Sequence, residues 1–208
     1  MSRTEIRLCG FGGQGIILAG HILGKAVALY DKKHATLTQS YGPESRGGAC
    51  SAKLIISDEP VHYPHLIKPS ILVAMSQEAY LKYEPELSDD GLLFYDENLV
   101  KPGRTNPRRG TFSIPATRLA EEELGHRIMA NIVMLGFLAA VTRIVSLEAL
   151  RQAIRTSVPP GTEAANERAL EKGITYGRGA DEAQEPDQIF QRRAEPDDGR
   201  TQRPGSRA

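Results

Sequence analysis

An apolar stretch that runs through a glycine-rich turn into a helical pattern is the feature that most limits how this chain can fold. Residues 6–9 are apolar apart from one arginine, the turn reads Gly10-Phe-Gly-Gly-Gln-Gly15, and an apolar helical pattern covers 16–27. A strand that turns directly into a helix leaves backbone N–H groups free at the positive end of the helix dipole. Glycine permits positive φ there and leaves room for an anion. The pattern predicts a strand–turn–helix unit with an anion-binding turn.

A second glycine-rich turn follows within forty residues and reads Tyr41-Gly-Pro-Glu-Ser-Arg-Gly-Gly48. Arg46 adds a fixed positive charge in front of two glycines, whose amides can form another anion-binding nest. Two such turns in one chain predict a site for a phosphate-bearing ligand.

Strand-like and helix-like patterns alternate through the first half of the chain. We expect strands over 6–9, 34–40, 49–57, 71–75 and 92–95, and helices over 16–30 and from the N-cap Ser76 through Tyr83. This order favours an α/β fold, which we expect to be a three-layer α/β/α sandwich with a mostly parallel sheet. The step between the second and third strands is too short for a parallel crossover, so the sheet should be mixed.

The second half of the chain is predicted to be helical. Helices are expected over 116–124 and 128–141, then after the N-cap Ser146, and from the N-cap Thr162 to Gly173 as the C′ residue. The apolar helix 128–141 suits the core, and also suits burial against another subunit. Beyond Tyr176 the composition turns polar, so we expect one domain over 1–176 and a disordered tail over 177–208.

Composition argues against several classes of function. Acidic and basic side chains balance at 26 each, so no bulk charge attracts the chain to nucleic acid or to a membrane surface. The longest apolar run, 132–141, is too short to span a bilayer, and the N-terminus has no apolar leader. Two cysteines cannot hold an iron–sulfur cluster, and the five histidines lack metal-ligand spacing. We expect a soluble cytoplasmic protein that binds no metal itself.

The first turn also matches the Gly-x-Gly-x-x-Gly fingerprint of dinucleotide-binding domains. That fingerprint needs an acidic residue at the end of the second strand, whereas Asp31 precedes this strand and Ser40 ends it. No Gly-Lys-Ser/Thr ends the turn, so a Walker loop is also disfavoured. Taken alone, the first turn is as consistent with a tight strand–helix connection as with a ligand site.

Taken together, the two turns resemble those of the gamma subunit of 2-oxoacid:ferredoxin oxidoreductases. The resemblance is carried by Gly10-Phe-Gly-Gly-Gln-Gly-Ile-Ile-Leu-Ala-Gly20, Thr38-Gln-Ser-Tyr-Gly-Pro-Glu-Ser-Arg-Gly-Gly-Ala-Cys-Ser51, Ala74-Met-Ser-Gln-Glu-Ala-Tyr80 and Asn166-Glu-Arg-Ala-Leu-Glu-Lys-Gly173. It extends from about residue 4 to residue 173 and excludes the tail. The second turn looks most like that of the 2-oxoglutarate branch, followed by the branched-chain 2-oxoacid enzymes.

The resemblance implies a subunit that is inactive alone and completes an active site made by others. Such enzymes decarboxylate a 2-oxoacid on thiamine diphosphate with Mg²⁺, reduce ferredoxin through iron–sulfur clusters and transfer the acyl group to coenzyme A. The thiamine diphosphate and the clusters would lie in alpha, beta and delta partner subunits. This chain would help to bind coenzyme A, without a catalytic residue of its own. The residues expected to line that site are Gly12, Gly13, Gln14, Gly15, Ser40, Tyr41, Ser45, Arg46, Gly47 and Gly48.

Two other hypotheses remain open at this point. The chain could be a free-standing oxidoreductase of the Rossmann type, which would bind a nucleotide without partners. It could also be a scaffold whose glycine turns only shape a subunit contact. Purification of the chain with and without its partner subunits distinguishes the free-standing oxidoreductase from the other two hypotheses. Coenzyme A titration then distinguishes the scaffold from the subunit that binds coenzyme A.

Overall fold

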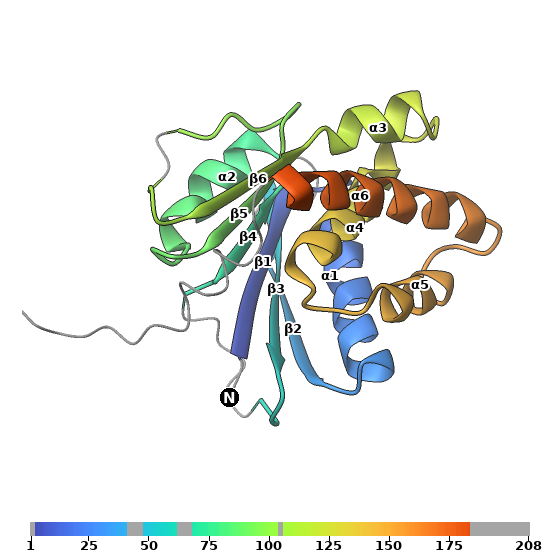
Figure 1. Ribbon diagram of the computed structural model, residues 1–208, viewed down its shortest axis with the longest axis horizontal. Helices are drawn as coiled ribbons and strands as arrows, with labels where there is room; N and C mark the ends of the chain where they lie inside the picture. Colours follow the sequence, from blue (N-terminus) through green and yellow to red (C-terminus); the bar gives the residue numbers. More distant parts are fainter. Residues whose placement is uncertain (1–2, 41–47, 62–67, 104–105, 184–208) are drawn as a thin grey trace, which may run out of the picture.

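The computed structural model describes residues 3–40, 48–61, 68–103 and 106–183. These residues form a six-stranded sheet in the order β2-β3-β1-β4-β5-β6 (Figure 1). The strands are β1 (Arg3–Phe11), β2 (His34–Ser40), β3 (Ala49–Ser57), β4 (Ile71–Ala74), β5 (Leu92–Asp96) and β6 (Gly110–Ile114).

The sheet is mixed, as predicted. β1, β4, β5 and β6 run parallel, whereas β3 lies antiparallel to both β1 and β2. β6 was not predicted, because five residues after a glycine- and proline-rich stretch carry too weak a pattern. In the structure β6 is defined by its pairing with β5, where Phe112 stacks on Phe94 at 4.9 Å between ring centroids.

Helices cover both faces of the sheet, which confirms the three-layer α/β/α sandwich. One face carries α1 (Ile16–Lys25), α4 (Ala130–Thr142), α5 (Leu147–Arg155) and α6 (Glu163–Ala183), and α2 (Gln77–Tyr83) covers the other (Figure 1). α3 (Ala116–Glu122) follows β6, and short helical turns occupy Ala26–Tyr30, Glu84–Glu86 and Arg127–Met129.

Local sequence signals account for several of these boundaries. The hydroxyl of Ser76 accepts a hydrogen bond from the N–H of Ala79, and that of Ser146 accepts one from the N–H of Ala149. Two of the three predicted N-caps are therefore confirmed. Side chains alternate along the strands. Leu8, Val73 and Phe94 face the helices α1 and α4, while Cys9 and its neighbours on the other face pack under α2.

The apolar helix α4 is buried inside this chain. Twelve of its thirteen residues are buried, and the exception, Ala140, is partly exposed. Phe137 packs edge-on against Phe94 of the sheet, and α6 crosses α4 on the outside. The part of α4's apolar surface that suggested a partner subunit is therefore covered by α6.

The predicted end of the last helix at Gly173 is wrong. α6 continues to Ala183, ten residues beyond Gly173, so residues 177–183, which the sequence predicts as part of the tail, are helical. Gly173 serves a different purpose, because a Cβ at this position would lie 1.9 Å from the carbonyl oxygen of Val133 in α4. The remaining part of the predicted tail, 184–208, lies outside the described residues. Within the described ranges, no helix combines the length and apolarity needed to cross a membrane.

Candidate functional site

Both glycine-rich turns follow strands that end at the same edge of the sheet. The parallel strands β1, β4 and β5 all end at this edge, here called the carboxyl edge. Phe11, the last residue of β1, pairs with Ala49, the first residue of β3. Turn 12–15 follows Phe11, and turn 41–48 connects Ser40 at the end of β2 with Ala49. Ligands of open α/β sheets bind outside the carboxyl ends of strands, so this edge is the candidate site.

The backbone of the first turn has the geometry that the sequence predicts. Gly13 has φ of 97° and Gly15 has φ of 73°, both in the region that favours glycine. A Cβ at Gly13 would have no heavy atom of the described residues within 4 Å, so this glycine borders open space. Gly13 is therefore required by backbone conformation and leaves an approach for a ligand.

The helix that follows this turn begins without a side-chain cap. Gly15 is the N-cap of α1, and none of the described side chains caps it. The first bond of the helix runs from the N–H of Ala19 to the carbonyl of Gly15, at 2.9 Å. The N–H groups of the first turn of α1 therefore have no partner within the helix, and the dipole adds positive potential there.

Gln14, predicted to contact the ligand, uses its side chain to hold the turn. Its Oε1 accepts a hydrogen bond from the N–H of Phe11 at 2.7 Å. Its Nε2 donates to the carbonyl of Met75, just beyond β4, also at 2.7 Å. Both ends of the amide are therefore engaged, and Gln14 links the ends of β1 and β4.

The start of α4 also reaches this site, which was not predicted. Asn131, in the first turn of α4, donates a hydrogen bond from Nδ2 to the carbonyl of Gly15 at 3.1 Å. The two helices α1 and α4 thus begin next to each other at the first glycine-rich turn. Periodicity placed 128–141 in the core, but no local signal indicates a contact between residues 116 positions apart.

The structure brings together the predicted site residues that it describes. Gly12, Gly13, Gln14 and Gly15 form the first turn, Ser40 lies exposed at the end of β2, and Gly48 directly precedes β3. Tyr41, Ser45, Arg46 and Gly47 lie outside the described residues, so their predicted contacts remain predictions.

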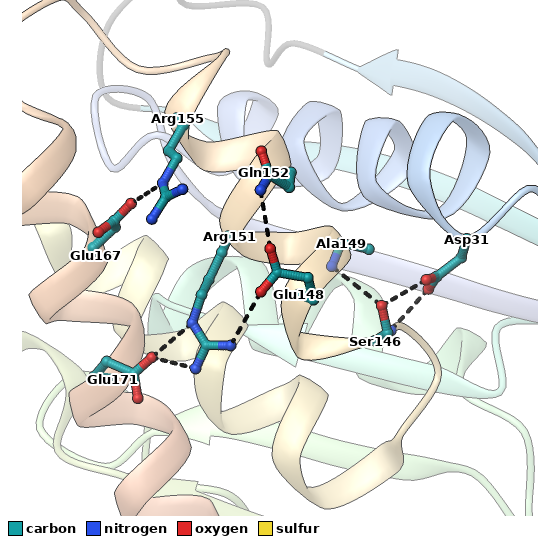
Figure 2. A network of polar contacts seen from close by, with 9 residues as sticks. All are labelled: Asp31, Ser146, Glu148, Ala149, Arg151, Gln152, Arg155, Glu167 and Glu171. Atoms are coloured by element: carbon teal, nitrogen blue, oxygen red, sulfur yellow. Dashed lines mark hydrogen bonds and ion pairs between the residues drawn. The ribbon is translucent and has the colours of Figure 1, made fainter.

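The acidic residue considered for a dinucleotide lies at the wrong end of β2. Asp31 precedes β2, opposite to the carboxyl edge, and its carboxylate accepts hydrogen bonds from the N–H and the hydroxyl of Ser146 at 2.8 and 2.6 Å. Figure 2 shows this carboxylate directed at the start of α5. Asp31 therefore anchors α5 and cannot hold a ribose beside the glycine turn.

The described part of the site offers binding groups rather than reactive ones. Burial raises the pKa of the Cys9 thiol and also that of Cys50, so both are protonated and shielded. The hydroxyl of Ser76 is buried and engaged in capping α2. Across the described ranges, no three His, Cys, Asp or Glu side chains are grouped to hold a metal ion. Backbone amides at positive helix ends fit an anion such as a phosphate.

The mixed sheet, with the first glycine-rich turn and the starts of α1 and α4 at its carboxyl edge, defines a layered α/β domain. The family model described as pyruvate ferredoxin/flavodoxin oxidoreductase matches residues 5–176. The chain belongs to this family.

Two similar proteins place the chain more closely within the family, and a third shares its fold. It is 55% identical over 177 residues to the 2-oxoglutarate synthase subunit KorC of Methanocaldococcus jannaschii, covering 85% of this chain and 95% of that protein. The keto/oxoacid ferredoxin oxidoreductase gamma subunit of Geobacter sulfurreducens has 40% identity and a TM-score of 0.78, covering 86% and 99% of the two chains. A 2-oxoglutarate:ferredoxin oxidoreductase from Magnetococcus marinus, solved with 2-oxoglutarate, coenzyme A and succinyl-CoA, shares the fold at 21% identity and a TM-score of 0.79. That match covers 86% of this chain and 32% of the other.

Proposed function

We propose that this chain is the gamma subunit of a 2-oxoglutarate:ferredoxin oxidoreductase and that its carboxyl edge binds coenzyme A. The relative from Methanocaldococcus jannaschii supports the substrate branch, since it is a 2-oxoglutarate synthase subunit matched over nearly its whole length. The gamma-subunit relative from Geobacter sulfurreducens supports the division into subunits. The branched-chain 2-oxoacids are the alternative substrate class.

The open first turn is the observation that carries the coenzyme A site. Coenzyme A has a pyrophosphate and a 3′-phosphate, and such groups bind at glycine turns that lead into helices. Gly13 leaves an approach, and the N–H groups at the start of α1 supply donors. Arg46 would add a charge-assisted hydrogen bond to one phosphate.

The rest of the reaction is assigned to partner subunits. Thiamine diphosphate with Mg²⁺ and the iron–sulfur clusters would lie in alpha, beta and delta subunits, which pass electrons to ferredoxin. This chain would hold coenzyme A so that its thiol reaches the acyl group formed there. The proposal includes a cytoplasmic location, where coenzyme A and ferredoxin are available.

A matched pair of glycine variants tests the site in the assembled enzyme. Gly13 and Gly161 both have positive φ, and neither would bring a Cβ within 4 Å of another described residue. Alanine therefore introduces similar backbone strain, about 1–2 kcal/mol, at both positions. Gly13→Ala should raise the apparent KM for coenzyme A with little change in the 2-oxoacid KM, whereas Gly161→Ala should leave both unchanged. Equal coenzyme A kinetics in the two variants would exclude a site at the first turn.

Arg46→Ala tests the second turn separately. Loss of a charge-assisted hydrogen bond should weaken coenzyme A by about 1.5–3 kcal/mol, which corresponds to roughly a ten- to hundredfold rise in its KM. A pure scaffold role predicts a lower yield of complex, with normal coenzyme A kinetics in whatever assembles. A normal KM for Arg46→Ala would thus remove the phosphate contact and leave Arg46 with a structural role.

A further inference from the structure

Asn131 packs directly against the residue that ends the first glycine-rich turn. Asn131 is almost fully buried, with 3% exposed, although it is a polar residue in a helix whose other residues, apart from Thr142 at its end, are apolar. Its Nδ2 donates to the carbonyl of Gly15 at 3.1 Å. A Cβ on Gly15 would lie 2.3 Å from the same Nδ2, so the amide group fills the space that the glycine leaves.

The carbonyl of Gly15 receives two hydrogen bonds, and they act on different elements. The N–H of Ala19 donates to it as the first bond of α1, and Asn131 donates to it from α4. A carbonyl oxygen has two lone pairs, so both bonds can form together. The orientation of the peptide group after Gly15, which carries the N–H of Ile16, is thereby fixed from two sides.

Gln14 holds the turn from the opposite direction. Its amide connects the N–H of Phe11 with the carbonyl of Met75, so the turn is attached to β1, to the end of β4 and to the start of α4. Gly13 lies between these attachments and borders open space. The turn is consequently fixed at its flanks and accessible in its middle, which is the form of a preorganised binding loop.

We propose that Asn131 is a positioning residue for coenzyme A: it orients the backbone amides of the first glycine-rich turn without touching the ligand. The inference rests on the proposed coenzyme A site. Capping of α4 does not explain Asn131, because its side chain bonds to the carbonyl of Gly15 and the N–H of Ala130 already bonds to the carbonyl of Arg127. A binding loop that must be ordered on each binding event loses affinity, so Asn131 raises affinity by ordering it in advance.

Asn166 offers a matched control in the same chain. It is also a largely buried asparagine near the start of a helix, and its Nδ2 also donates to a backbone carbonyl, that of Thr162, at 2.9 Å. That bond lies within the start of α6 and does not involve the glycine-rich turns. Replacing either asparagine therefore removes one partly buried amide–carbonyl bond, but only Asn131 attaches the first turn.

The first measurement is hydrogen–deuterium exchange on the assembled complex without coenzyme A. Asn131→Ala should speed exchange in the peptide that covers 10–19 by about tenfold, as expected when a local opening costs about 1.4 kcal/mol less. Asn166→Ala should leave that peptide unchanged. Asn131→Asp, which keeps the size but removes the donor, repeats the test if the alanine variant does not assemble. Unchanged exchange at 10–19 in the variant that assembles would overturn the inference.

The second measurement separates binding from stability and from chemistry. Asn131→Ala or Asn131→Asp should raise the coenzyme A KM by about three- to tenfold, the equivalent of one lost hydrogen bond, with kcat and the 2-oxoacid KM unchanged. A normal coenzyme A KM in these variants, with the KM raised in Gly13→Ala, would overturn the inference and leave the site standing. A normal coenzyme A KM in both the Asn131 variants and Gly13→Ala would overturn the coenzyme A site itself.

Discussion

Cys9 and Cys50 are neighbours in adjacent strands but lie on opposite faces of the sheet. Cys9 packs under α2 and Cys50 packs on the side of α1. Side chains that alternate across a strand cannot form a disulfide through the sheet. The chain therefore holds two shielded thiols with raised pKa values rather than a redox pair.

We expect neither thiol to be alkylated by iodoacetamide in the folded protein, because the reactive thiolate form is suppressed by burial. Both should react at once in denaturant. Asp90→Cys adds an exposed cysteine as a positive control, and mass spectrometry counts the labels. Labelling of the native wild-type chain at the rate of the control would contradict the burial of these thiols.

Arg7 is the largest fully buried side chain among the described residues, with 1% exposed. Its Nη2 lies 2.6 Å from Oε2 of Glu86, and its guanidinium stacks 4.4 Å from the ring centroid of Tyr83. Its Nε and Nη1 have no hydrogen-bond partner in the described ranges. Burial of a charge with incomplete hydrogen bonding opposes folding, and Glu86 offsets part of that cost.

Removal of the counterion should therefore cost more than removal of the charge. We expect Glu86→Gln to lower the free energy of unfolding by about 1–3 kcal/mol, because Arg7 stays buried with weaker compensation. Arg7→Met, of similar length and apolar, should stay within about 1 kcal/mol of the wild type. Urea denaturation measures both. A larger loss for Arg7→Met than for Glu86→Gln would show that Arg7 stabilises the fold directly.

Residues whose partners are near in sequence could be predicted, and residues with distant partners could not. Ser76 and Ser146 cap helices through an N–H three positions later, so a local pattern identified both. Asn131 donates a hydrogen bond to Gly15, and nothing in the local sequence around Asn131 indicates that contact. Likewise, Gln14 was placed in the site, but its bond to Met75 becomes visible only in the fold.

At the scale of elements, α4 and α6 cross at close range through glycines on both helices. A Cβ at Gly173 would lie 1.9 Å from the carbonyl oxygen of Val133, and one at Gly136 would lie 2.3 Å from that of Leu170. Both nearest atoms belong to backbone, which cannot rotate away as a side chain can. Any side chain at either position must push the helices apart.

Two glycines of α6 should therefore respond in opposite ways to alanine. Gly173→Ala should destabilise the protein by about 1–3 kcal/mol, the range for forced overpacking. Gly179→Ala, where a Cβ would meet no heavy atom of the described residues within 4 Å, should be neutral or stabilise by up to about 1 kcal/mol through helix propensity. Thermal unfolding measures both. Equal effects at the two positions would rule out a close crossing at Gly173.

A surface network of ion pairs joins α5 to α6 (Figure 2). Arg151 donates from Nε to Glu171 at 2.9 Å, and Arg155 pairs with Glu167. The hydrogen bond from Arg155 lowers the pKa of Glu167 below the ordinary value of 4.5. The contribution of this pair to stability is therefore complete above that value and is lost as the pH falls through the lower pKa of the folded state.

Glu167→Gln should accordingly be less stable than the wild type at neutral pH, by a small amount because the pair is exposed. The difference should shrink as the pH falls below 4.5 and should disappear once Glu167 is protonated in the folded state. Chemical denaturation at a series of pH values checks this. A difference that persists in acid would mean that the charge of Glu167 is not the cause.

The sequence predicted those elements that have a strong local pattern. The bounds of β2 and β3 were predicted to the residue, since Thr-rich and apolar runs end at clear turns. β6 was missed because its existence depends on pairing with β5. The end of α6 was misplaced because a glycine inside a helix at a close crossing looks the same in sequence as a glycine that ends one.

At the scale of the whole molecule, the chain is one part of a larger oxidoreductase. The family model covers residues 5–176, and two cysteines cannot supply the thiolates of an iron–sulfur cluster. We expect no 2-oxoglutarate-dependent reduction of ferredoxin or of a viologen by the isolated chain, even with cofactors added. Activity should appear when the partner subunits are combined with it. Turnover by the isolated chain would refute its assignment as a gamma subunit.

The C-terminal boundary of the folded unit can be tested by truncation at two points. Ile174 of α6 is buried at 1% exposure, and Gly177 lies against Ala140 of α4, so the part of α6 beyond Lys172 covers α4. The segment 184–208 has only Ile189 and Phe190 as large apolar residues and therefore little surface to bury.

Truncation after Ala183 should leave the melting temperature and the assembly of the complex unchanged, because α6 and its contacts with α4 are retained. Truncation after Lys172 should destabilise the chain by several kcal/mol, since it removes a buried isoleucine, worth about 2–5 kcal/mol by itself, and exposes α4. Calorimetry and size-exclusion chromatography with the partner subunits measure both effects. Loss of assembly after truncation at Ala183, with an unchanged melting temperature, would show that 184–208 contacts a partner. The double variant Ile189→Ser and Phe190→Ser would then locate that contact.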